Sequence, residues 1–98
     1  MAVTKENLIE LIQLPSINIE LDKQGILHIT YVEGSIIDIE EKKEELQAIL
    51  KLTKGEKHPV IFYFETMVTV THAAKEYSVK AESEFPYLAV ALLAKDFA

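Results

Sequence analysis

The chain has 98 residues, a length that suits one domain and excludes two. Ten lysine and arginine residues against sixteen acidic ones give a formal net charge of −6, which argues against nucleic acid and anionic lipid as partners. The absence of cysteine excludes disulfides and thiolate catalysis and fits a reducing compartment, so we expect a cytoplasmic protein.

Two features argue against export and membrane insertion. Glu6 and Glu10 interrupt the first apolar stretch, whereas the apolar region of a secretory signal is uncharged. The longest nearly uninterrupted apolar run, residues 85–94, is about half as long as a membrane-spanning helix requires. We therefore expect no signal peptide and no membrane span.

The N-terminal segment, residues 1–15, fits two conformations. Thr4 is placed to cap a helix, and Pro15 would end it. An extended conformation of residues 8–14 fits almost as well. We therefore predict an N-terminal helix or extension before a core of residues 16–98. The helical alternative depends on four apolar residues at helical spacing: Leu8, Ile9, Leu11 and Ile12.

A β-hairpin is predicted at the start of this core. Apolar and polar residues alternate over residues 17–22, which is typical of a half-buried strand. The turn Asp22-Lys23-Gln24-Gly25 then places glycine where the chain needs a positive φ, and residues 26–32 supply the second strand. The two strands should pair antiparallel.

The next segment has the signals of a helix at both ends. Asp38 followed by Glu41 forms a capping box, in which each side chain accepts a hydrogen bond from the other residue's backbone amide. Gly55 stands where a left-handed residue ends a helix. The charged run over residues 40–45 is interpreted as the solvent-exposed face of this helix.

The remainder alternates strand, helix and strand. Residues 60–64 and 87–94 are apolar on both faces, which is typical of interior parallel strands, and a second helix is expected over residues 73–81. The predicted fold is α/β (α+β): a mixed sheet in the order β-β-α-β-α-β with an antiparallel N-terminal hairpin. An uncovered apolar face of several hundred Å² would cost on the order of 10 kcal/mol, so we expect a homo-oligomer, most simply a dimer.

Three stretches together resemble the STAS domain of anti-sigma factor antagonists, in its SpoIIAA-like form, and a related group of small bacterial proteins. NIELDKQGILHITY resembles the opening hairpin, EGSIIDIEEKKEEL the entry to the first helix, and PVIFYFETMVTVTHAAKEY the central strand and switch turn. The resemblance covers nearly all of the chain from Ile17 onward. It implies a STAS-like fold and a regulatory role through protein binding.

The sequence departs from this family in two places. In the antagonists the switch turn carries an Asp-Ser-Ser-Gly motif with a phosphorylated serine, but here the corresponding residues are His72-Ala73-Ala74-Lys75. Relatives also continue past a strand like residues 87–95 into one more strand and a closing helix. That difference implies either a truncated form or a sheet completed by another chain.

The switch turn and the strand before it supply the candidate site residues: Glu65, Thr69, Thr71 and His72. Thr71 is interpreted first as a helix N-cap, and second as a phosphoacceptor in place of the missing serine. Glu65 follows the central strand, at the end where open α/β sheets place ligand crevices. The three histidines, with His28 and His58, are too far apart in the sequence to indicate a metal site.

We therefore expect a non-enzymatic regulatory or protein-interaction module, without catalytic residues, cofactor or metal. An alternative is a small-molecule or lipid-binding module of the SEC14-like type, with an apolar pocket between the sheet and the helices. An enzyme using Glu65 and His72 is a third possibility, although no nucleophile elbow, glycine-rich loop or paired carboxylates accompany them.

Overall fold

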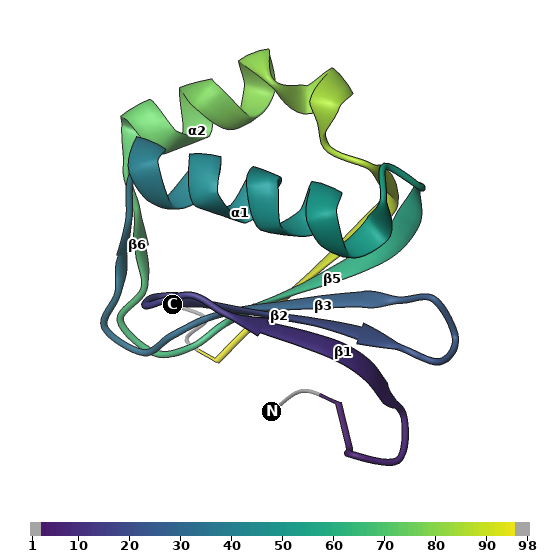
Figure 1. Ribbon diagram of the computed structural model, residues 1–98. Helices are drawn as coiled ribbons and strands as arrows, with labels where there is room; N and C mark the ends of the chain where they lie inside the picture. Colours follow the sequence, from purple (N-terminus) through teal and green to yellow (C-terminus); the bar gives the residue numbers. More distant parts are fainter. Residues whose placement is uncertain (1–2, 96–98) are drawn as a thin grey trace.

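The fold is a mixed five-stranded sheet with both helices on one face, as Figure 1 shows for a computed structural model that describes residues 3–95. The sheet has the strand order β1-β2-β3-β5-β7, and a separate pair is formed by β4 and β6. The elements are β1 (Leu8–Gln13), β2 (Ile17–Asp22), β3 (Leu27–Tyr31), β4 (Ile36–Ile37), α1 (Ile39–Thr53), β5 (His58–Phe64), β6 (Thr69–Val70), α2 (His72–Lys80), the 3-10 helix η1 (Glu82–Glu84) and β7 (Tyr87–Ala94).

Of the two conformations predicted for the N-terminal segment, the helix is wrong and the extended one is confirmed, because residues 8–13 form the edge strand β1. It pairs antiparallel with β2 after a tight connection in which the Leu14 amide donates to the Ile17 carbonyl at 2.8 Å. A helix this short would be marginal alone, whereas the strand shares the hydrogen bonds of β2. The pairing slips between Leu8 and Glu10, so Ile9 forms an irregularity in this outer strand.

The predicted antiparallel hairpin is confirmed as β2 and β3. Gly25 has φ +82°, as the turn requires, and its amide donates to the Asp22 carbonyl at 3.0 Å. The Asp22 side chain accepts from the amides of Gln24 and Ile26, both at 2.9 Å. The turn is therefore fixed by one carboxylate and one glycine.

Helix α1 begins at the predicted capping box. Asp38 is the N-cap and accepts from the Ile39 amide, while Glu41 accepts from the Asp38 amide at 2.8 Å. The helix crosses over the sheet and leads into β5, which pairs parallel with β3. β7 then pairs parallel with β5, so the mixed sheet expected from the sequence is confirmed.

Two short strands were not predicted. β4 and β6 pair in parallel through Ile36 with Thr69 and Ile37 with Val70, directly before the two helices. Thr71 then caps α2, accepting from the Ala74 amide at 3.1 Å. Its hydroxyl donates to Asp38 Oδ1 at 2.8 Å, so the N-caps of the two helices are joined by a hydrogen bond.

The hydrophobic core lies between α1 and the face of the sheet beneath it. Apolar residues of neighbouring strands pair in register, as for Ile19 with Ile29 and Ile29 with Phe62. Among the described residues no helix is long and apolar enough to cross a membrane. The largest buried cluster contains Ile17, Ile19, Leu27, Ile29, Tyr31, Ile37, Ala48, Ile49, Leu52, Val60 and Phe62.

Candidate functional site

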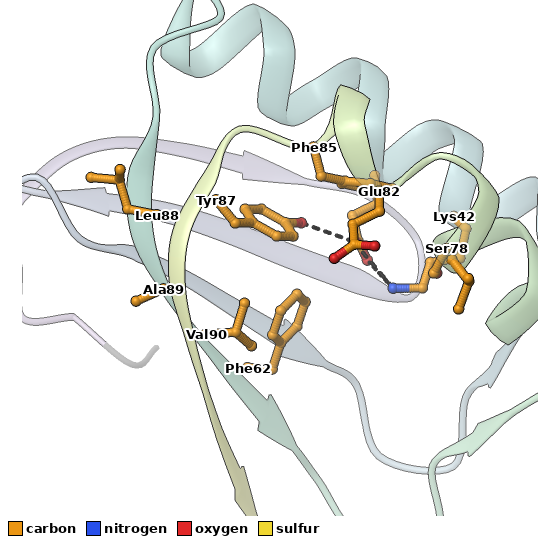
Figure 2. Close-up of a pocket in the computed structure, with 11 residues that line it drawn as sticks. Lys42, Phe62, Ser78, Glu82, Phe85, Tyr87, Leu88, Ala89 and Val90 are labelled. Atoms are coloured by element: carbon orange, nitrogen blue, oxygen red, sulfur yellow. Dashed lines mark hydrogen bonds and ion pairs between the residues drawn. The ribbon is translucent and has the colours of Figure 1, made fainter.

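A groove of about 550 Å³ lies where α1, the α2–η1 segment, β5 and β7 meet. α1 covers the middle of the sheet, and β7 lies beyond it at the edge, which leaves the groove open. Figure 2 shows Tyr87, Val90 and Phe62 on its side of β7 and Ala89 on the other. The lining residues are Lys42, Glu45, Phe62, Ser78, Val79, Glu82, Phe85, Tyr87, Leu88, Ala89 and Val90.

A buried ion pair forms the polar floor of this groove. The Lys42 side chain is 11% exposed and that of Glu45 is 0%, and Lys42 Nζ lies 3.3 Å from Glu45 Oε2. The prediction that residues 40–45 form a solvent-exposed face is therefore wrong for these two. Lys42 Nζ also lies 5.3 Å and 5.5 Å from the ring centres of Tyr31 and Phe62, within range of cation–π attraction.

Two tyrosines complete the hydrogen bonding of the buried carboxylate. Tyr31 donates to Glu45 Oε1 at 2.6 Å, Tyr87 donates to Oε2 at 3.3 Å, and Lys42 donates to the Tyr31 oxygen at 2.8 Å. Burial raises the pKa of both phenols, and the negative charge of Glu45 raises each pKa further. Both tyrosines therefore stay protonated as donors, and neither is activated as a nucleophile.

Strand β7 forms the outer wall of the groove and the exposed edge of the sheet. Its eight residues carry no charge, and Leu88, Val90, Leu92 and Leu93 are 64%, 55%, 63% and 52% exposed. Lys95 donates its backbone amide to the Phe64 carbonyl at 3.2 Å, so by strand alternation the peptide groups of Val90 and Leu92 point away from β5. Among residues 3–95 no strand pairs with this edge.

The predicted site residues lie near one end of the sheet but form no joint site. Glu65 follows β5 and forms an ion pair with Lys95 at 2.7 Å, while the exposed His72 lies 2.9 Å from Glu76 on its own helix. Thr69 is exposed in β6, and Thr71 is the predicted N-cap. None of the hydrogen bonds or ion pairs found among the described residues joins Glu65 to the other three.

The hydrogen bond between Thr71 and Asp38 bears on the interpretation of Thr71 as a phosphoacceptor. The hydrogen bond from the Thr71 hydroxyl holds the pKa of the Asp38 carboxyl below its ordinary value, and the hydrogen bond from the Ile39 amide lowers this pKa further. A phosphate on Thr71 would meet the favourable amino terminus of α2 but also the Asp38 carboxylate, 2.8 Å from the present oxygen. Phosphorylation would therefore break the link between the two caps.

A second polar cluster was missed at the sequence level. On the sheet face opposite the helices, His28 Nε2 lies 2.8 Å from Asp22 Oδ2 and its Nδ1 lies 2.8 Å from the Tyr63 hydroxyl. Burial acts to raise the pKa of Asp22, but hydrogen bonds from His28 and from the Ile26 and Gln24 amides outweigh it and lower the pKa. Only the register of β2, β3 and β5 brings these residues together, so the sequence carried no local signal.

Within residues 3–95 no group of three or more His, Cys, Asp or Glu side chains is arranged to hold a metal ion. A family model described as a domain of unknown function (DUF7793) matches residues 19–97 of the chain. No curated protein and no solved structure matches the chain.

Proposed function

The chain belongs to the DUF7793 family, and we propose that it is a cytoplasmic, non-enzymatic interaction module with a STAS-like fold. In this proposal it acts in regulation by binding another polypeptide along β7. The STAS-like assignment is supported by the antiparallel hairpin, the two parallel crossovers and the helices gathered on one face of the sheet. The interaction role is carried by the exposed, uncharged edge of β7.

The composition of β7 supports binding of an extended segment. An edge strand exposes a row of peptide groups that can pair with another chain, and soluble proteins commonly protect such edges with charges, proline or bulges. The outward-facing stretch from Val90 to Ala94 contains none of these. Addition of a strand would satisfy the peptide groups and cover apolar side chains on both faces, as in known modes of peptide recognition.

The buried polar groups at the groove support recognition more than catalysis. Lys42 donates to Tyr31 and Glu45, and both tyrosines donate to Glu45, so these groups are engaged with one another. A general base or nucleophile needs a free lone pair directed at substrate. The network instead holds α1, β3 and β7 in fixed relative positions beside the binding edge.

Site-specific photo-crosslinking in cells tests the proposal. A photoreactive amino acid at Leu92 should give discrete cross-linked species, whereas the same group at Ile9, an exposed apolar residue of β1, should give none. Adding Val90→Lys should abolish the Leu92 product, because a charge would then lie in the covered seam. Equal labelling from the two positions would contradict the proposal.

The groove favours one alternative function, binding of a small apolar molecule or lipid. Its volume of about 550 Å³ falls in the range of ligand sites, and its walls are mostly apolar. Native mass spectrometry of gently purified protein should then show an added mass. Ser78→Trp, which places a large side chain in the groove, should remove that added mass. If the wild-type protein showed no added mass, this alternative would be excluded.

A further inference from the structure

We propose that the polypeptide bound by β7 is a second copy of this chain, paired antiparallel about a two-fold axis at Ala91. The inference rests on the proposed interaction function and specifies its partner and register. The result would be a continuous ten-stranded sheet made from two copies of the five-stranded one. Both copies would keep their helices on the same side of the joined sheet.

The distribution of charge along the edge selects the antiparallel direction. η1, which precedes β7, contains Glu82 and Glu84, and β7 is followed by Lys95. Antiparallel pairing places Glu82 and Glu84 of the two copies at opposite ends of the seam, next to the ion-paired Lys95, whereas parallel pairing would put these acidic segments side by side. The uncharged residues between them let two acidic proteins approach without repulsion at the seam.

Strand geometry then restricts the register. A two-fold axis perpendicular to a sheet must pass beside a residue that faces its own copy, because only this keeps the paired side chains on the same face. The pairing of β5 with β7 shifts between His58 and Pro59, which leaves Leu88 irregular at the start of β7. An axis at Ala91 pairs residues 89–93 of the regular part with one another and leaves the irregular Leu88 opposite Ala94 at each end of the seam.

The peptide groups and side chains both fit this axis. Val90 and Leu92 have outward-facing peptide groups, so each Val90 would form a hydrogen-bonded pair with Leu92 of the second copy. Ala91 would be the central non-hydrogen-bonded pair, where strands approach most closely and a small side chain fits. On the helix side the valine and leucine of both copies would form one apolar cluster beside the two grooves.

The extent of the seam indicates the affinity. Seven residues of each copy, from Leu88 to Ala94, would pair, whereas a standard interface contains about 20–30 residues a side. We therefore expect a dimer with a micromolar dissociation constant. Light scattering should show a mass that rises from one to two copies over this concentration range, and Leu92→Lys should weaken association at least tenfold.

Cysteine substitutions test the register directly, because the chain contains no cysteine of its own. In this register the Ala91 Cα atoms would be about 4.5 Å apart, within the range that a disulfide spans. Under mild oxidation Ala91→Cys should form a covalent dimer. Leu93→Cys alone should not, because Leu93 would face Ala89 of the second copy, but mixed Leu93→Cys and Ala89→Cys proteins should cross-link.

Each outcome separates this inference from the broader function. A wild-type protein that stays monomeric at 100-fold above the micromolar range would overturn the self-pairing, and photo-crosslinking at Leu92 to a different polypeptide would then preserve the interaction role. A dimer in which Ala91→Cys cross-links no better than Leu93→Cys would overturn the register. Selective cross-linking of Ala91→Cys, together with loss of dimer in Leu92→Lys, would establish it.

Discussion

Removal of the Lys42 ammonium should strongly destabilise the fold. At 3.3 Å from Glu45 Oε2, an effective dielectric constant of about 20 gives an attraction of about 5 kcal/mol. Loss of one partner of a buried pair leaves the other charge desolvated, at a cost of about 3–5 kcal/mol. Lys42→Met keeps most of the side-chain volume, so we expect a loss of that size in the free energy of unfolding.

The loss is large compared with the total stability of about 5–15 kcal/mol for a domain, and corresponds to a decrease in Tm of about 12 °C or more. Urea denaturation followed by circular dichroism measures it, with an unchanged m-value as the sign that both proteins unfold in the same way. Lys43→Met, an exposed neighbour on the same helix, is the matched control and should change stability by less than about 0.5 kcal/mol.

A second variant separates the ion pair from the packing of the lysine chain. Lys42→Met combined with Glu45→Gln removes both charges and keeps an oxygen that accepts from the Tyr31 hydroxyl, so no buried charge is left without its partner. The double variant should therefore recover most of the lost stability. If Lys42→Met cost less than about 1 kcal/mol, or if the double variant were less stable than the single one, the buried charge would not be the cause.

Three further predictions concern the cap, the turn and the second polar cluster. Thr71→Val should lower the free energy of unfolding by about 1 kcal/mol, and a carboxyl NMR titration should show the Asp38 pKa raised towards its ordinary value. An unchanged pKa would show that the hydrogen bond between Thr71 and Asp38 does not form in solution. Gly25→Ala should lower the free energy of unfolding by about 1–2 kcal/mol, because alanine is strained at a φ of +82°. The added Cβ would lie an ordinary 3.6 Å from its nearest atom, so no clash is expected. A much larger loss of stability on thermal melting would mean that a steric clash occurs. The native pKa of Asp22 lies below the unfolded value near 3.8, so the stability it contributes is present above pH 3.8 and disappears as the pH falls through the native pKa. The difference in unfolding free energy between wild type and Asp22→Asn should shrink in that acid range, and a difference independent of pH would contradict the assignment.

The elements predicted correctly were those with a local signal. The capping box of Asp38 and Glu41 fixed the start of α1, and the uncharged run from Tyr87 to Ala94 gave β7 its observed bounds. The conformation of β1 was ambiguous because a short apolar segment fits both the helical and the strand period, and only its pairing with β2 decides between a helix and a strand. The strands β4 and β6 are two residues long, too short to show any period.

The candidate site was less accessible to sequence reasoning. Glu45 stands in a run of charged residues, and the groups that make its burial possible come from Tyr31 and Tyr87, distant in the chain. The Asp22, His28 and Tyr63 cluster likewise exists only through strand register. By contrast, Thr71 was identified as a cap because its partner, the Ala74 amide, is only three residues away.

The irregular pairing of β1 at Ile9 has a consequence for assembly size. A sheet with two regular open edges can add copies without end, in the manner of a fibril. Here the slip between Leu8 and Glu10 disturbs the outer edge of β1, and Glu10 places a charge on it, so that edge is a poor template. Growth through β7 would therefore stop after one pairing, leaving a closed particle in place of a polymer.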